Sequence, residues 1–300
     1  MSLPYQLIAL DVDGTLVEPG CGCARPAVRR AVDAAQALGA KVVIASGRCQ
    51  LAAADPRVLG GIRPDYLICT GGAQLVDAAG RELFARHFTP EQMYALVDFC
   101  ENFDDELAFS FSDGYYVYIG FESVYRHYGD MAEHAEFLHN GEDQDRHLQS
   151  MPCAGFCHMP PDRVAEFDRL YGHLGLRFIP FTRDWYDICQ AGQTKASALA
   201  VLLEQLGLDP AGLLAVGDGE NDVEMLRLAG LGVAMGNAAP AAKAAADRVA
   251  PDVKQDGAAL LLDEVFGLGL GLAGGAGEGP AAVPAAGNKT PQAPKAEGCP

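Results

Sequence analysis

Short apolar runs alternate with longer amphipathic segments over the first 86 residues. The runs YQLIAL, KVVIAS and DYLICT predict three buried strands, which begin at residues 5, 41 and 65. A helix is expected over residues 26–38, where a proline occupies the first turn. The segments AQLVD and RELFAR, joined by AAG, predict a hairpin.

The same pattern returns near residue 187. Thr194 is placed to cap a helix over residues 195–206, which Gly207 would end. The runs LLAVGD and LGVAM predict two further strands around a helix over residues 222–228, and PAAKAAAD and DRVAP predict a helix and a last short strand. Strands that alternate with helices predict an α/β fold with a doubly wound parallel sheet.

A segment of different character separates these halves. In residues 87–186 the alternating aromatic runs LAFSFSD and YYVYIGF predict strands, and helices are expected near residues 90–102 and 162–172. We therefore expect a discontinuous core of residues 1–86 and 187–266 with an α+β insert at 87–186. Trp185 and Tyr186, where the insert ends, either contact a ligand or brace the hinge, and the second interpretation is favoured.

The C-terminal segment lacks this patterning. Residues 267–300 are rich in Gly, Ala and Pro and show no apolar periodicity. We expect them to form a disordered tail, because nothing in them offsets the entropy of ordering the chain.

Composition narrows the possible functions. The chain has 300 residues, with 22 basic and 40 acidic side chains and a net charge of −18. An acidic chain is a poor binder of nucleic acids or anionic membranes, which attract clustered Lys and Arg. The start lacks a signal-peptide pattern and no apolar run is long enough to span a membrane, so we expect a cytoplasmic protein with reduced cysteines.

The insert carries most of the charge. It holds 18 acidic and 6 basic residues, contains no Lys, and includes all seven His of the chain. Catalysis that needs histidine therefore cannot be built from core residues alone.

The strongest motif follows the first strand. Asp11 and Asp13 lie two residues apart in an extended segment, so their side chains can point toward one ligand, and Gly14 allows the chain to turn. Ligands of open α/β sheets bind at the carboxyl ends of strands. Taken alone, this motif also resembles part of a calcium loop.

Further motifs occupy other strand ends and a helix start. Ser46-Gly47-Arg48 follows the second strand, Lys195 begins a helix, and the run GDGEND at residues 217–222 follows the strand LLAV. Ser, Lys and Asn side chains can contact phosphate oxygens, whereas Asp11 and Asp218 offer carboxylates to a hard cation. Mg²⁺ favours a few carboxylates together with substrate phosphate.

This set, in this order, resembles the haloacid dehalogenase (HAD) superfamily of phosphohydrolases. The insert between Ser46 and Lys195 is similar to that of the Cof-type branch, which carries a type-2 cap there, and the resemblance covers roughly residues 5–266. It implies a HAD-like core with an α+β cap domain. The implied activity is Mg²⁺-dependent hydrolysis of small phosphorylated metabolites through an aspartyl-phosphate.

The resemblance also implies residue roles. Asp11 would be the nucleophile, and Asp13 the general acid and then the base. Mg²⁺ would be held by the Asp11 and Asp218 side chains and by the Asp13 backbone carbonyl. Phosphate oxygens would be held by three groups: Ser46, the Gly47 amide and Lys195.

The remaining motif residues would act around these. Asn221 would contact phosphate or orient Lys195, and Asp222 would hold Lys195 or a metal-bound water. Four aspartates and a phosphate dianion face only two cations, Lys195 and Arg48, so we expect activity to depend almost completely on the metal.

The substrate is less defined. Relatives often carry Asn-Gly-Ala after the third strand, whereas this chain has Thr70-Gly71-Gly72-Ala73, with Gly71 where the Asn would stand. The acidic insert favours a substrate with one phosphate, such as a sugar or polyol phosphate. A phosphosugar mutase and a phospho-regulated binding protein remain as alternatives, and the oligomeric state is left open.

Overall fold

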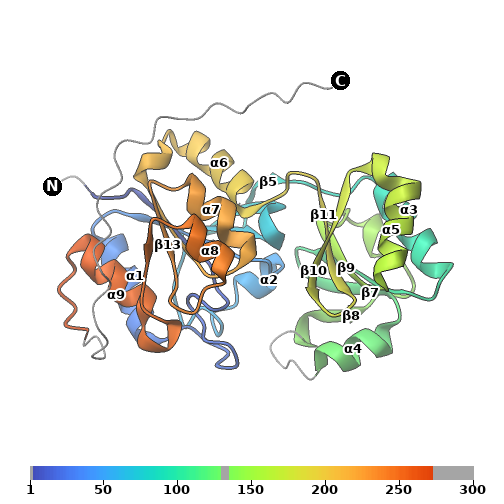
Figure 1. The fold of residues 1–300 in the computed structure, drawn as a ribbon, viewed down its shortest axis with the longest axis horizontal. Coiled ribbons are helices and arrows are strands. Elements are labelled where there is room, and N and C mark those ends of the chain that lie inside the picture. The colour runs from blue at the N-terminus through green and yellow to red at the C-terminus, as the bar shows by residue number, and fades with distance from the viewer. Residues whose placement is uncertain (1–2, 130–134, 273–300) are drawn as a thin grey trace.

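The protein is built around two sheets, in a computed structural model that describes residues 3–129 and 135–272 (Figure 1). The first sheet has the strand order β14-β13-β12-β1-β2-β3-β4-β5. Its strands are β1 (Leu7–Leu10), β2 (Lys41–Ala45), β3 (Tyr66–Cys69), β4 (Gln74–Asp77), β5 (Glu82–Ala85), β12 (Leu213–Gly217), β13 (Leu231–Ala234) and β14 (Arg248–Val249). The six strands from β14 to β3 are parallel, as predicted, and β4 and β5 form the predicted antiparallel hairpin.

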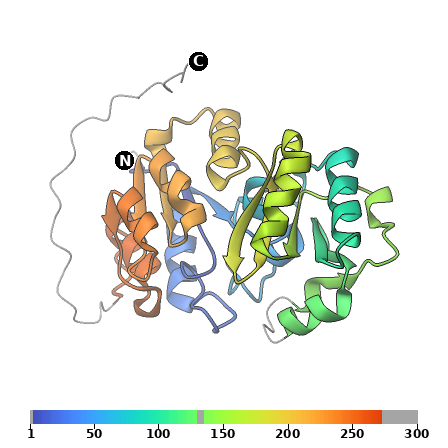
Figure 2. The same ribbon diagram turned by 45° about the vertical axis from the view of Figure 1, so that its right-hand side comes forward.

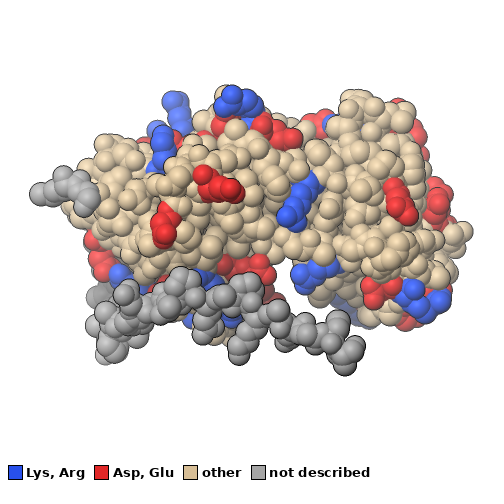
Figure 3. Space-filling view, turned by 90° about the horizontal axis from the view of Figure 1, so that it is seen from above, with Lys and Arg blue, Asp and Glu red and all other residues tan. Residues whose placement is uncertain are grey.

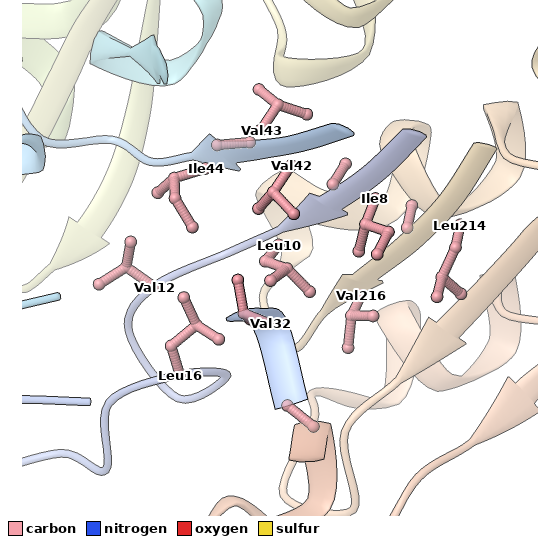
Figure 4. Close-up of a cluster of buried hydrophobic side chains, with 14 of the residues drawn as sticks. Ile8, Leu10, Val12, Leu16, Val32, Val42, Val43, Ile44, Leu214 and Val216 are labelled. Carbon is pink, nitrogen blue, oxygen red and sulfur yellow. The ribbon is translucent and has the colours of Figure 1, made fainter. Parts of the chain in front are cut away.

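The apolar runs become the centre of this sheet. Every residue of β1 is buried, and Leu10 is paired with Val216 on one side and Ile44 on the other. The close-up of this region shows these side chains packed with others above and below the strands (Figure 4). A parallel strand covered on both faces needs such a continuous apolar sequence.

Helices cover both faces of the first sheet (Figures 1 and 2). On one face α1 (Pro26–Ala37) packs against α9 (Gly257–Phe266), and on the other α6 (Lys195–Leu206), α7 (Val223–Leu228) and α8 (Pro240–Ala245) lie in a row. The α6 helix begins at a capping box of Thr194 and Ser197 and ends at left-handed Gly207, as its sequence predicted. The helix α9 was not among the elements predicted from the sequence.

The second sheet is mostly antiparallel, in the order β10-β11-β9-β6-β7-β8. Its strands are β6 (Glu106–Phe111), β7 (Gly114–Ile119), β8 (Leu138–Asn140), β9 (Ala154–His158), β10 (Leu176–Thr182) and β11 (Trp185–Gln190). The last strand thus continues four residues beyond the predicted end of the insert at residue 186.

The two faces of the second sheet have different surroundings. The predicted helices, α3 (Pro90–Glu101) and α5 (Pro161–Tyr171), lie on the side away from the first sheet (Figures 1 and 2). The opposite face is turned toward the first sheet and carries Tyr115, Phe156 and Trp185, beside the unpredicted helix α4 (Phe121–Gly129). Side chains of the second sheet that face the core therefore come from this opposite face.

The side chains of Trp185 and Tyr186 both pack against other side chains of the insert. The Trp185 indole is 4% exposed and is stacked between His127, at 4.5 Å, and His158, at 4.9 Å. Tyr186 packs edge-on against Phe178 at 6.4 Å. The ring faces of Trp185 are therefore closed to a ligand.

The segment after α9 differs in part from the expected tail. Within residues 267–272, Leu268, Leu270 and Leu272 pack against the core, contrary to the predicted disorder of these six residues. The rest of the predicted tail, residues 273–300, lies outside the described residues. Within the described ranges no helix is both long and apolar enough to cross a membrane. On the face shown in Figure 3, Lys and Arg are scattered among acidic side chains and form no continuous basic patch.

Candidate active site

The predicted motif residues converge where the parallel strands end. β1 lies between β12 and β2, and the chain proceeds outward from β1 in both directions, which makes this point the topological switch of the sheet. Asp11 follows β1, Ser46 follows β2 and Asp218 follows β12, so all three leave the sheet at the same edge. The backbone amide of Asp11 donates to the Val216 carbonyl at 3.0 Å, which continues the pairing up to this edge.

Lys195 joins two carboxylates at the centre of the site. Its ammonium nitrogen lies 2.6 Å from Asp11 Oδ1 and 2.7 Å from Asp222 Oδ1. All three side chains are buried, with exposed fractions of 1% for Lys195, 8% for Asp11 and 0% for Asp222. The α6 capping box fixes the start of the helix that carries Lys195. A buried charge needs such partners, because burial without them costs several kcal/mol, on the order of 3–5.

Burial changes the protonation behaviour of these groups. Burial, together with the nearby charge of Asp222, raises the pKa of Asp11 well above its usual range. The pKa of Lys195 is raised despite its burial, because two carboxylates stabilise the ammonium form. Burial and the charge of Asp222 also raise the pKa of Asp218 to about 6. The site is thus crowded with negative charge that Lys195 alone does not neutralise.

Asp222 shapes the loop that follows β12. While its Oδ1 accepts from Lys195, its Oδ2 accepts the backbone amides of Asp218 and Gly219, both at 2.9 Å. Gly217 allows this folding back, since a Cβ there would lie 2.5 Å from the Asp222 carboxyl carbon. Both oxygens of Asp222 therefore have protein partners.

Asp13 is bound by Arg48 and not by Lys195 among the contacts of the described residues. The guanidinium contacts both carboxylate oxygens, with Nε–Oδ2 at 3.0 Å and Nη2–Oδ1 at 2.6 Å. The Arg48 side chain is 3% exposed, whereas that of Asp13 is 55% exposed. The pair therefore presents an accessible carboxylate held by a buried cation. This contact was not predicted.

The loop after β2 is held by the neighbouring loop after β3. Ser46 Oγ accepts the Arg48 amide at 3.1 Å, and the Ser46 carbonyl accepts the Gly71 amide at 3.0 Å. Gly71 has a left-handed φ of 62° with open space at its Cβ position. Because Asn tolerates this conformation better than most residues, both Gly and Asn are compatible with the backbone at this position. Gly47 is exposed beside this loop.

The two asparagines near the site differ in their contacts. Asn221 is exposed, and among the described residues no hydrogen bond joins it to Lys195, so it does not orient that side chain. Asn237, which the sequence analysis missed, donates to the Gly14 carbonyl at 2.8 Å and to Asp218 Oδ2 at 3.2 Å. It follows the predicted strand LGVAM, so the strand-end rule that selected Asp11 and Asp218 could have selected it.

The acidic residues can hold a metal ion. Oxygens of Asp11, Asp218 and Asp222 lie within 4.8 Å of one another. Because Asp222 is fully engaged by Lys195 and two amides, Asp11 and Asp218 are the carboxylates left to bind a cation. Two carboxylates in a negatively charged site fit a hard divalent ion.

Comparisons with known proteins agree with this geometry. A phosphoglycolate phosphatase from Natronomonas pharaonis is 28% identical over 85% of this chain and 96% of its own. One structure was solved in an analysis of phosphatases of the haloalkanoate (HAD) superfamily, from Bacteroides thetaiotaomicron. It is 25% identical, covers 88% of this chain and 96% of its own, and has a TM-score of 0.77.

Another match is local. Over 76 residues the chain is 46% identical to the chloroplastic endoribonuclease YBEY of Arabidopsis thaliana, and the matched segment covers 25% of this chain and only 13% of that protein. The family described as haloacid dehalogenase-like hydrolase matches residues 8–262. With this match over most of its length, the chain belongs to the haloacid dehalogenase-like hydrolase family, in the Cof-type branch that its motifs and insert predicted.

Proposed function

We propose that this protein is a Mg²⁺-dependent phosphatase that hydrolyses small metabolites with one phosphate group. The observation that carries the proposal is the position of Asp11, at the end of the central strand, bonded to buried Lys195 and within metal-binding distance of Asp218. A carboxylate in this setting can attack a phosphoryl group, because cationic groups compensate the charge of the incoming phosphate.

The proposed reaction has two steps. Asp11 attacks phosphorus, an aspartyl-phosphate forms, and the bond to the leaving oxygen breaks while Asp13 donates its proton to that oxygen. Asp13 then accepts a proton from water, which attacks the phosphorus and releases phosphate and free Asp11. The two contacts of the Arg48 guanidinium would hold the Asp13 carboxyl group in place for both steps.

The other motif residues would bind the phosphoryl group. Lys195, Ser46 Oγ and the Gly47 amide are proposed to hold its oxygens, with exposed Asn221 at the rim. The side chains of Asp11 and Asp218 and the Asp13 carbonyl would hold Mg²⁺, which supplies positive charge to the transferring phosphoryl group. Asp222 would keep Lys195 and the loop after β12 in place.

The second sheet is proposed to act as a cap over this site. Asp187 on β11 lies opposite Phe156, so it is on the face turned toward the core. Within the described ranges this exposed carboxylate has no hydrogen bond or ion pair. A carboxylate can accept hydrogen bonds from hydroxyl groups but repels a second anionic group, which favours sugar or polyol monophosphates.

The test is a phosphate-release screen with Mg²⁺ over sugar, polyol and nucleotide phosphates, phosphoglycolate and bisphosphates. Sugar or polyol monophosphates should be turned over best, and Asp11→Asn should be inactive on all of them. Release of an isomer in place of inorganic phosphate would identify a mutase instead. Full activity of Asp11→Asn would overturn the proposal.

A further inference from the structure

Beyond the chain connections, the two sheets meet at the short helix α2 (Gln50–Ala53), directly after Arg48. The amide of Cys49 donates to the Tyr115 hydroxyl at 3.0 Å, and the amide of Leu51 donates to the Ser112 carbonyl at 2.9 Å. Ser112 lies in the turn between β6 and β7, and Tyr115 is the second residue of β7, in the second sheet. Two backbone donors of the core thus have acceptors in the insert.

These donors need partners from elsewhere. The first amides of a helix have no acceptor within it, and Cys49, at the start of α2, provides no side-chain cap. Cys49 is also buried, with 0% exposure, so water does not replace a lost acceptor there without a rearrangement. Loss of the Tyr115 hydroxyl while the second sheet stays docked would therefore leave the Cys49 amide unsatisfied.

Neighbouring contacts stabilise the same junction. Phe137 packs in a small cluster with Cys49 and Ala52, against which Tyr115 also lies. Arg57 reaches across to Glu136 at 2.6 Å, but this pair is exposed and such pairs contribute little, about 0–1 kcal/mol. Burial raises the pKa of Tyr115 well above its usual value, which keeps the hydroxyl protonated. The part-buried hydroxyl contact is therefore a stronger candidate than the exposed Arg57–Glu136 pair for coupling the two sheets.

The residue before Cys49 connects this junction to the candidate active site. Arg48 has its amide bonded to Ser46 Oγ at 3.1 Å and its carbonyl bonded to the Thr70 amide at 2.8 Å, while its guanidinium holds Asp13. The peptide group between Arg48 and Cys49 is thus held at its carbonyl by a core loop and at its N–H by Tyr115 of the insert.

We propose that Tyr115 is a positioning residue, which ties docking of the second sheet to the placement of Arg48 and, through it, of Asp13. The general acid and base would then be correctly oriented only while the cap is docked. This inference rests on the proposed function for the role of Asp13, whereas the docking contact itself is independent of that role.

The test compares Tyr115→Phe with Tyr116→Phe in the full-length protein. Tyr116 is the matched control, because its hydroxyl contacts exposed Asp113 at 3.2 Å within the insert. For Tyr115→Phe, kcat should fall about ten- to a hundredfold with KM little changed, as expected for a misplaced catalytic group. Hydrogen exchange of a peptide covering residues 46–53 should become faster. Tyr116→Phe should change neither.

A double-mutant cycle with Arg48→Lys provides the sharper measurement. If Tyr115 acts through Arg48, the two effects on kcat will be strongly non-additive. Additive effects, or unchanged exchange at residues 46–53 in Tyr115→Phe, would overturn the inference. If the wild type released phosphate from no substrate while exchange still responded, the proposed function would fail and the docking contact would stand.

Discussion

The two sheets of this protein place functional groups in different ways. In the first sheet the candidate site forms where parallel strands end, and Asp11, Ser46 and Asp218 converge because their strands are neighbours. In the second sheet, groups such as Tyr115 and Asp187 project from the face of antiparallel strands that is turned toward the first sheet. The first arrangement follows from chain order, whereas the second depends on register and on which face is covered.

This difference separates reaction chemistry from substrate choice. The centre of the strand-end site is buried and charged, with Lys195 held by two carboxylates. The sheet face is more open and leaves Asp187 without a protein partner in the described part of the chain. Changes to the first region should therefore affect all substrates, and changes to the second should affect some more than others.

Removal of the metal should have the largest effect on the strand-end site. With EDTA in excess we expect loss of nearly all phosphate release for every substrate, because Lys195 and Arg48 cannot offset four aspartates and a phosphate dianion. Added Mg²⁺ should restore activity. The measurement is initial-rate phosphate release before chelation, after chelation and after restoration. Activity that persists under chelation would contradict the charge argument.

Loss of the central cation should be nearly as damaging. Lys195→Met leaves Asp11 and Asp222 buried without their cation, so unfolding free energy should fall by about 3–5 kcal/mol and activity by on the order of a thousandfold. Urea denaturation and phosphate release measure the two effects. Lys41→Met is the control, because Lys41 forms a more exposed ion pair with Asp65. It should lower the free energy of unfolding by less than about 1 kcal/mol.

Two adjacent glycines test how closely the core loops approach. A Cβ at Gly72 would collide with the Thr194 carbonyl and lie 2.9 Å from the Lys195 amide, whereas one at Gly71 would meet nothing within 4 Å. Both residues have positive φ, so both alanine variants carry about 1–2 kcal/mol of strain. For Gly72→Ala the free energy of unfolding should fall by about 1–3 kcal/mol more than for Gly71→Ala, and most activity should be lost. Thermal unfolding measures the first effect and phosphate-release kinetics the second. Equal losses would show that the approach to Lys195 is unimportant.

Substitution on the sheet face should have a selective effect. Asp187→Asn should raise KM for polyol monophosphates by about tenfold, the loss expected for one hydrogen bond to a charged group. Its relative activity on phosphoglycolate should rise, because a repulsive charge is gone. With p-nitrophenyl phosphate, which has no aliphatic hydroxyl groups, kcat should stay close to that of the wild type. A uniform loss over all three would assign Asp187 to the chemistry instead.

The smallest expected effect is that of Asp187→Asn on how the free energy of unfolding changes with pH. Asp187 remains accessible, yet the surrounding protein removes enough water to raise its pKa from 3.8 to about 6. Between these values the unfolded chain loses this proton first, so stability falls as the pH rises through this window and then levels. Asp187→Asn should lack this contribution. Parallel stability curves for the two proteins from pH 4 to 7 would contradict the shifted pKa.

Sequence reasoning was most informative for the first sheet. The strand-end rule needs only strand order and the residue after each strand. The fold predicted from the alternation of strands and helices is confirmed, and so is the family that the motifs and insert resemble. The strand-end rule missed Asn237, although that residue also follows a strand, because one amide carries less signal than a run of aspartates. The helix α9 was not predicted, because GAALLLDEVF has only two charged residues and its polar face is therefore narrow.

For the second sheet the sequence was less informative for a physical reason. The contact of Tyr115 with the Cys49 amide joins residues 66 positions apart and depends on how two sheets dock, which no local pattern encodes. The bidentate contact of Arg48 with Asp13 likewise depends on loop geometry after two strands. Trp185, considered as a ligand contact, is enclosed between two histidines from other elements.

The most direct test of the account is to trap the covalent intermediate. The enzyme is mixed with Mg²⁺ and its best substrate, quenched in acid during turnover, digested and analysed by mass spectrometry. The account predicts one phosphoryl group on the peptide that contains Asp11, absent from Asp11→Asn. Turnover without phosphorylated Asp11, or with the phosphoryl group on another residue, would contradict it.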